Sequence, residues 1–137
     1  MNETLVSSTQ VAPVSRKVLW VGYILSALPV LMLLMSGIMK LIKPPFVAEG
    51  FKHLGIPESL SRGLGILELT CTIIYVIPRT SVIGAILLTG YLGGAILTHL
   101  RVGEPVFAQF LFGVAIWGGL YLRDPRLRAL IPLRRPV

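Results

Sequence analysis

The chain is poor in charged residues and in cysteine, and both shortages narrow what it can be. Only 14% of its 137 residues are Asp, Glu, Lys or Arg, whereas soluble domains average about 25%. The single cysteine, Cys71, excludes an intrachain disulfide, a Cys-x-x-Cys redox motif and any multi-cysteine metal site. We therefore predict no metal site and interpret Cys71 as a small core residue.

Apolar residues make up 54% of the chain, and the mean hydropathy is +0.79. This composition predicts a membrane protein, and the length suits one compact domain. A formal net charge of +7 could indicate nucleic-acid binding. However, the Lys and Arg residues flank the apolar runs, as membrane topology requires, and form no basic stripe on one element. The predicted partner is therefore the lipid bilayer and not a nucleic acid.

Four apolar runs predict membrane spans at about residues 18–41, 63–78, 80–99 and 105–122. A helix needs about 20 residues to cross the hydrocarbon core. The second run is short and contains Glu68, but the tight Pro78-Arg79-Thr80 turn to the third run predicts a helical hairpin. The first run exceeds the roughly 7–15 apolar residues of a signal peptide, so we interpret it as a retained span.

The predicted fold class is all-α, a four-helix transmembrane bundle in residues 16–124. A disordered tail, residues 1–15, precedes it, and a basic tail, residues 125–137, follows it. Val47, Phe51 and Leu54 recur at helical spacing in the long first loop. This pattern predicts a short amphipathic helix in the first extracytoplasmic loop, lying on the membrane surface or capping the bundle.

The distribution of positive charge predicts the orientation of the bundle. Eight Lys and Arg residues flank the side that holds the termini, and five flank the other side. The eight are Arg16, Lys17, Arg79, Arg123, Arg126, Arg128, Arg134 and Arg135, and the five are Lys40, Lys43, Lys52, Arg62 and Arg101. The positive-inside rule then predicts a multi-pass protein of the cell (inner) membrane with both termini in the cytoplasm.

Glu68 is the most informative residue, because it lies inside an apolar span. A carboxylate there costs about 2.5–3.5 kcal/mol on insertion scales, so it persists mainly where it faces the bundle interior with a partner. With four alternating spans, Lys40, His99, Arg101 and Gln109 fall in the same half of the bundle as Glu68, away from the termini. We predict that these residues converge. Whether Glu68 pairs with Lys40, His99 or Arg101 stays open, as does a purely structural salt bridge.

Helical spacing places further polar side chains on the faces that carry these residues. Their hydroxyls could form the wall of a polar pocket between the spans. They are Ser36 on the first span, Thr72 and Tyr75 on the second, and Tyr91 on the third. Gly90 and Gly94 have the small-xxx-small spacing that permits close helix approach.

Several segments, in their order and spacing, resemble the DoxX-like family of small four-span membrane proteins over nearly the whole chain. They are Ser36-Gly37-Ile38-Met39-Lys40-Leu41, His53-Leu54-Gly55-Ile56-Pro57, Gly65-Ile66-Leu67-Glu68-Leu69, Ile77-Pro78 and Ala95-Ile96-Leu97-Thr98-His99. The resemblance implies that Lys40, Glu68 and His99 are residues typical of the family. Some members of the family are linked to quinone-dependent sulfur oxidation or membrane oxidoreductase complexes, and distant relatives are cargo receptors or assembly chaperones.

The first functional hypothesis is a pocket for a small lipophilic, quinone-like molecule, in an oxidoreductase component or an acid/base enzyme. Its candidate catalytic residues are Glu68, His99 and Lys40. Its candidate substrate-binding residues are Arg101, Gln109, Thr72, Tyr75, Tyr91 and Ser36. The chain has one cysteine and no facing histidine pair, so no intrinsic cofactor is expected. Electrons would pass to a quinone or to the cofactor of a partner oxidoreductase.

The alternative hypothesis is a non-catalytic subunit, chaperone or receptor that binds a protein partner through the first outer loop. Here a Glu68–Lys40 pair would fix the bundle. Whether the protein is an enzyme therefore stays open, and a homo-oligomer is compatible with either hypothesis. A transporter is a weaker interpretation, since four spans without a visible inverted repeat make a small carrier.

Overall fold

The computed structural model describes residues 14–130, and within this range the chain forms helices and no β-strand. The elements are α1 (Arg16–Ile42), α2 (Pro45–Leu54), the 3-10 helix η1 (Glu58–Leu60), α3 (Ser61–Val76), α4 (Ser81–Arg101), α5 (Phe107–Arg123) and α6 (Pro125–Leu130). The prediction of an all-α fold is confirmed. Most of the predicted tail at residues 1–15, and residues 131–137 of the C-terminal tail, lie outside the described residues.

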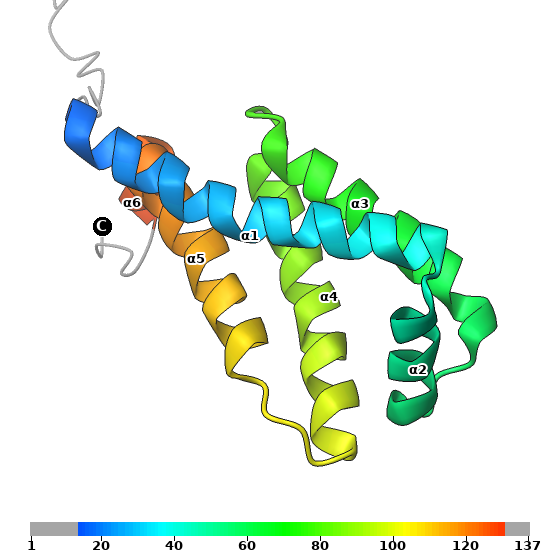
Figure 1. Ribbon diagram of the computed structural model, residues 1–137. Coiled ribbons are helices and arrows are strands. Elements are labelled where there is room, and N and C mark those ends of the chain that lie inside the picture. The colour runs from blue at the N-terminus through cyan, green and yellow to red at the C-terminus, as the bar shows by residue number, and fades with distance from the viewer. Residues whose placement is uncertain (1–13, 131–137) are drawn as a thin grey trace, which may run out of the picture.

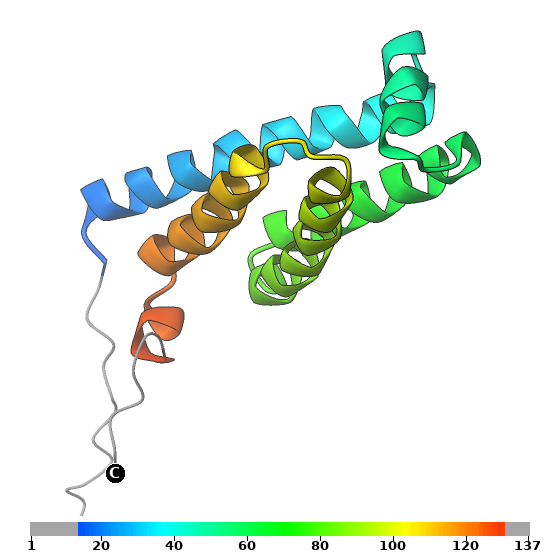
Figure 2. The same cartoon turned by 90° about the horizontal axis from the view of Figure 1, so that it is seen from below.

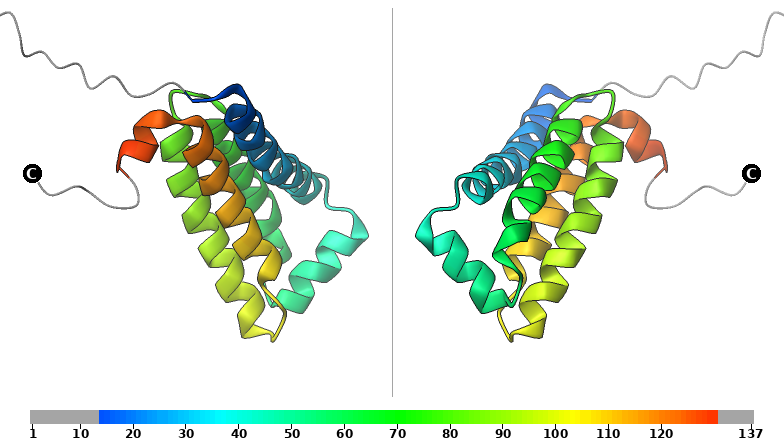
Figure 3. Two further views of the ribbon diagram at one scale, coloured as in Figure 1. Left: turned by 90° about the vertical axis from the view of Figure 1, so that its left-hand side faces the viewer. Right: turned by 90° about the vertical axis from the view of Figure 1, so that its right-hand side faces the viewer.

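The four long helices form a closed arrangement in which each packs against two others. α1 packs against α3 and α5, α3 packs against α4, and α4 packs against α5. α1 and α3 lie along one another, and the α4–α5 hairpin packs across them (Figures 1 and 2). The start of α1 and α6 lie at one end, whereas α2 and the α4–α5 connection lie at the other (Figure 3). The bundle therefore has two distinct ends.

Three stretches of the described chain are long and apolar enough to cross a membrane: α1, residues Glu58–Val76 and α4. α5 has 17 residues, the lower limit of the usual range for a span. The outward faces of these helices carry large apolar side chains, such as Leu31 and Phe107, which are 64% and 77% exposed. Such faces would be unfavourable in water, and they suit contact with lipid.

The predicted amphipathic helix is confirmed as α2. Pro45 begins it, at a position that suits proline, and Gly55 ends it in the left-handed conformation with φ of 68°. Phe51 is buried and Val47 and Leu54 are half-buried, so the predicted apolar face turns toward the bundle. α2 therefore covers the bundle end opposite the start of α1 and α6 (Figure 1).

The tightly packed core lies toward the end of the bundle that holds α6 and the start of α1. Tyr75 on α3 is 1% exposed, and its hydroxyl donates to the Ile116 carbonyl at 2.8 Å and hydrogen-bonds the Ser26 hydroxyl at 2.9 Å. This one side chain thus joins α3 to α5 and α1. Gly84 permits α4 to approach α3 at the same level, because a Cβ there would overlap the Tyr75 backbone.

One sequence expectation differs from the structure in detail. Gly90 and Gly94 were expected to permit close helix approach, but a Cβ at either would meet no atom within 4 Å. The close approach of α1 to α3 occurs instead at Gly37 and Gly65. The basic segment after residue 124 begins with the short helix α6, which is held to the bundle by the buried Leu127 and by Arg128, whose side chain donates to the Tyr121 carbonyl at 2.9 Å.

Candidate functional site

A cavity of about 920 Å³ lies between the helices at the α2 end of the bundle. All four long helices contribute to its wall, and Phe51, Leu54 and Ile56 bring α2 and the following turn into it. Most of the lining side chains are apolar, including Leu64, Leu67 and Phe112. The cavity is therefore suited to an apolar molecule that would meet only a few polar groups.

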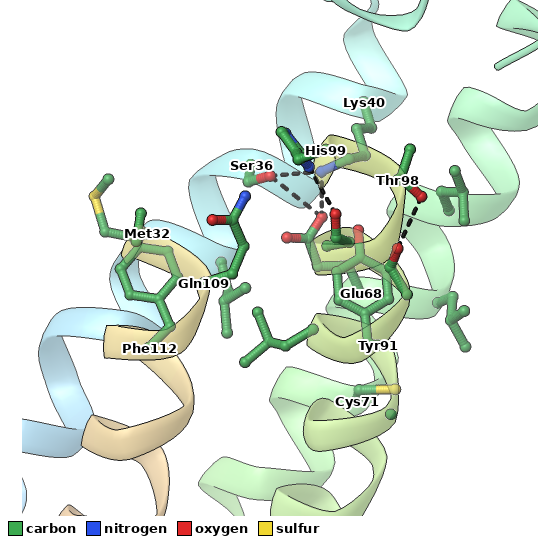
Figure 4. A pocket seen from close by; sticks show the side chains of 18 of the residues that line it. Met32, Ser36, Lys40, Glu68, Cys71, Tyr91, Thr98, His99, Gln109 and Phe112 are labelled. Atoms are coloured by element: carbon green, nitrogen blue, oxygen red, sulfur yellow. Dashed lines mark hydrogen bonds and ion pairs between the residues drawn. The ribbon is translucent and has the colours of Figure 1, made fainter. Parts of the chain in front are cut away.

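The main polar group is an ion pair between α1 and α3. The Lys40 ammonium donates to Glu68 Oε2 at 2.6 Å and to the Ser36 hydroxyl at 2.5 Å. Ser36 in turn donates to the same Glu68 oxygen at 3.3 Å. The Glu68 side chain is 2% exposed and that of Lys40 18% exposed, so the carboxylate is the more deeply buried partner. Figure 4 shows this group on one wall of the cavity.

The local sequence explains why these three side chains meet. Ser36 and Lys40 are four residues apart, so they stand one above the other on the same face of α1. Gly37 and Gly65 bring the α1 and α3 backbones together beside them. Ser61, two helical turns before Glu68, donates to the Lys40 carbonyl at 2.7 Å and fixes the register of the two helices. The convergence of Lys40 and Glu68 was predicted, with the partner left open; the structure selects Lys40.

Tyr91 and Gln109 add further polar groups to the wall. Tyr91 on α4 lies beside Glu68, and Gln109 on α5 extends into the same space from the other side (Figure 4). The Gln109 Oε1 atom is buried and has no hydrogen-bond partner within residues 14–130. An unpartnered buried polar atom is uncommon, because its removal from water costs about 1–3 kcal/mol and no hydrogen bond within the protein offsets that cost.

His99 lines the cavity but does not contact Glu68 through a hydrogen bond in the described part of the chain. Its Nδ1 lies 2.7 Å from the Ala95 carbonyl, and its Nε2 lies 3.7 Å from Glu104 Oε2. The other Glu104 oxygen lies 2.8 Å from His53 Nε2 on α2. A row of side chains thus leads from the cavity wall to His53, which is 59% exposed at the surface.

Three residues that were expected to bind substrate do not line the cavity. Thr72 donates to the Glu68 carbonyl of its own helix at 2.7 Å. Tyr75 belongs to the core at the α6 end of the bundle, where its hydroxyl donates to the Ile116 carbonyl. Arg101 donates to the Leu54 carbonyl and ties α4 to the end of α2. All three therefore stabilise the bundle outside this cavity.

Sequence reasoning missed Glu104 and the apolar wall supplied by α2. Glu104 lies in the connection between α4 and α5, and no sequence pattern assigned it a role. Its position depends on the turn after α4, where Gly103 adopts a positive φ of 77° and the Glu104 N–H donates to the His99 carbonyl. The one sequence signal for it is Gly103-Glu104, a turn dipeptide that begins four residues after His99, near the end of the third apolar run.

Comparison with known proteins identifies the family of the chain. The DoxX-like family model matches residues 24–120. The chain belongs to the DoxX-like family. The matched range contains Lys40, Glu68 and His99. No curated protein and no solved structure matches the chain.

Membership of the DoxX-like family, together with the apolar helices, makes this a multi-pass membrane protein. The outward apolar faces are accordingly lipid-facing surfaces. In this setting the Lys40–Glu68 pair is an ion pair within the bundle, at the wall of a cavity. Residues 14–130 include no group of three or more His, Cys, Asp or Glu side chains placed to hold a metal ion.

Proposed function

We propose that this DoxX-like protein binds a small lipophilic, quinone-like molecule in the cavity between its helices. The observation that carries the proposal is the combination of a cavity of about 920 Å³ with an apolar wall and one buried ion pair. Ligand sites are typically concave and mostly apolar, with a few placed polar groups that orient the ligand. Charged residues inside a membrane bundle are costly, and those that persist usually mark a functional site.

The proposed setting is the inner membrane, with four spans and both termini in the cytoplasm. α5 serves as the fourth span, because 17 residues reach across a thin or locally thinned hydrocarbon core. The excess of Lys and Arg at the end that holds α6 and the start of α1 supports this orientation. The cavity then lies in the outer half of the bilayer and is covered by α2 on the outer side.

The polar groups suit acid/base work on an oxygen of the ligand. The Lys40 ammonium can stabilise negative charge on a ligand oxygen, and Glu68 can accept a proton from it. His99 stands at the same cavity and connects through Glu104 toward the surface. In an oxidoreductase complex these residues would move protons, while a partner protein would supply the electron carrier.

A second candidate is a non-catalytic subunit or receptor, and the outer surface of α2 favours it. Phe46 on this helix is 64% exposed, although α2 is held against the bundle by Arg101 and by the His53–Glu104 pair. A docked helix with an exposed aromatic residue could present a binding surface to a protein partner. In that case the Lys40–Glu68 pair would serve only to join α1 and α3.

Filling the cavity separates these two candidates. Gly90 lines the cavity and a Cβ there meets open space, so Gly90→Leu should occupy the cavity without disturbing the backbone. Gly93 is on the same helix and also has open space, but it does not line the cavity, so Gly93→Leu is the matched control. Binding of a short-chain benzoquinone and of its hydroquinone, kept reduced under argon, is measured for purified protein in lipid nanodiscs.

The proposal expects saturable binding of at least one of the two forms to the wild type and to Gly93→Leu. It expects a loss of about tenfold or more in Gly90→Leu, since a filled cavity excludes the ring. Binding that is equal in all three proteins, or no greater than partition into empty nanodiscs, would contradict a ligand site in this cavity.

A further inference from the structure

The α3–α4 hairpin is closed at its turn and open toward the α2 end of the bundle. A Cβ at Gly84 would overlap the Tyr75 backbone, so the two helices touch at this level. Further along α4, a Cβ at Gly90 or at Gly94 would meet no atom of the described chain within 4 Å. The two helices accordingly diverge from their shared turn (Figure 1). We call the gap beside Gly90 and Gly94 the lateral opening.

The cavity extends into this lateral opening. Leu67 on α3 and Ile86 on α4 line the cavity, yet they are 49% and 57% exposed, so they also reach the outer surface of the bundle. Leu87, Gly90 and Gly94 combine the same two properties. None of these five residues is charged. The lateral opening is therefore apolar, and in a membrane it faces the lipid chains.

The other sides of the cavity are covered by side chains. At the outer end, Phe51 and Leu54 of α2 line the cavity, and Arg101 holds this end of α2 through the Leu54 carbonyl. Toward α5, the side chains of Gln109 and Phe112 form the wall, and the Gln109 Oε1 atom is buried (Figure 4). A molecule would therefore reach the cavity from the bilayer, between α3 and α4.

The charged groups lie deeper than the lateral opening. The Glu68 side chain is buried, and Lys40 and Ser36 bond to it from α1, on the side of the cavity away from α4. The cavity is thus polar at its inner wall and apolar where it meets lipid. This polarity matches a ligand with a compact polar head and an apolar tail. The tail would remain among apolar groups along its whole length.

We propose that the ligand is a single-tailed membrane lipophile, whose head lies beside the Lys40–Glu68 pair and whose aliphatic tail leaves between α3 and α4 into the bilayer. This inference rests on the proposed ligand-binding function. It names the class of ligand, a molecule that resides in the membrane, and the route by which that molecule enters.

The test compares two benzoquinones with the same ring, one with a methyl group and one with a decyl chain. Each is used in its oxidised and its reduced form. Binding is measured for full-length protein in lipid nanodiscs. Affinities are expressed against the concentration of probe dissolved in the nanodisc lipid, so that the partition of the decyl chain into the bilayer cancels.

The double variant Leu67→Trp/Ile86→Trp narrows the lateral opening from both sides. Its affinity for the decyl probe should fall by about tenfold or more, because the two indole rings occupy the path of the tail. Its affinity for the methyl probe should stay within about twofold of wild type, because the inner wall is unchanged. The matched control is Ile66→Trp/Ile83→Trp, at exposed positions of the same helices that do not line the cavity. It should bind both probes as wild type does.

Photo-crosslinking locates the tail in the wild-type protein without any substitution. The probe is the decyl benzoquinone with a diazirine midway along its chain, and mass spectrometry identifies the modified residues. We expect modification at Leu67 and between Ile86 and Gly90, suppressed by an excess of the unmodified decyl benzoquinone.

The outcomes separate this inference from the function on which it rests. Suppressible crosslinks on α2, or on α1 and α5, would overturn the route between α3 and α4 and leave the cavity as a ligand site. Equal affinities of the folded Leu67→Trp/Ile86→Trp variant and the wild type for the decyl probe would do the same, as would an equal loss of both probes. If neither probe binds the wild type above its partition into lipid, both the inference and the proposed function fail.

Discussion

Lys40 and Glu68 join the two helices that carry them and also supply charge to the cavity. Glu68 is the more deeply buried, so its carboxylate depends on Lys40 and Ser36 for stabilisation. Lys40 has a longer, more exposed side chain that can extend toward the membrane surface when its partner is removed. Removal of Lys40 should therefore lower the free energy of unfolding more than removal of Glu68 does.

Replacement of Lys40 by methionine should lower the free energy of unfolding by about 3 kcal/mol, because it leaves a buried carboxylate without its cation. Glu68→Leu should cost less, since Lys40 can reach solvent. The double variant should recover most of the loss, because a buried ion pair can be exchanged for apolar side chains at little cost. Denaturant titration of purified protein measures all three, and losses that simply add would contradict a direct pair.

For the polar residues on the inward face of α3, the sequence predicted the face but not which of them would line the cavity. Glu68, Thr72 and Tyr75 were correctly predicted to share an inward face, since all three are buried. However, the cavity occupies only one half of the bundle. Thr72 bonds its own helix and Tyr75 meets Ser26 and Ile116. Helical spacing specifies a face, but it does not indicate what the neighbouring helices place opposite it.

At the scale of elements, the helices themselves were largely predictable because charge-free runs and prolines mark their bounds. α3 ends at Val76, two residues before the predicted end, because the residue before Pro78 is disfavoured in the helical conformation and Ile77 is extended. The crossing points were not predictable. Whether a glycine faces another helix, as Gly84 does, or open space, as Gly90 does, depends on the packing of the whole bundle.

The α3–α4 crossing provides an element-scale prediction. Gly84→Ala should destabilise the protein by about 1–3 kcal/mol, because its methyl group would overlap the Tyr75 backbone and force the helices apart. Gly93→Ala on the same helix meets open space and should be neutral or stabilising by up to about 1 kcal/mol through helix propensity. Thermal unfolding of the two variants compares them directly. Equal effects would contradict the crossing.

The attachment of α2 gives a second prediction at this scale. Arg101 donates to the Leu54 carbonyl at the end of α2, so Arg101→Leu should loosen that end. Hydrogen exchange should become faster at the Gly55 and Ile56 amides, which bond to the last turn of α2. Arg62→Leu, an exposed arginine near the same bundle end, is the control. Unchanged exchange in Arg101→Leu would show that this contact does not hold α2.

At the scale of the whole molecule, the placement of both described ends of the chain at one end of the bundle matches the predicted alternation of spans (Figure 3). The side of the membrane on which they lie rests on the distribution of Lys and Arg. The membrane side of each loop can be tested by cysteine labelling, because Cys71→Ala removes the only thiol in the sequence.

In the Cys71→Ala background, we expect Ser59→Cys to react with a membrane-impermeant maleimide in intact cells, because η1 lies at the α2 end. Arg126→Cys, on α6, should react only after the membrane is permeabilised. Both positions are exposed, so a difference in labelling reports sidedness and not burial. The reverse pattern would place the termini outside and the cavity toward the cytoplasm.

The central claim is that the cavity holds a specific small lipophilic molecule, and mass spectrometry of what the protein retains tests it most directly. Organic extracts are compared from wild type, Gly90→Leu and Gly93→Leu, each purified from native membranes in the same detergent. The account predicts one lipophile retained in near-stoichiometric amount by wild type and Gly93→Leu and lost from Gly90→Leu. Identical extracts that contain only bulk lipid, from three equally folded proteins, would contradict it.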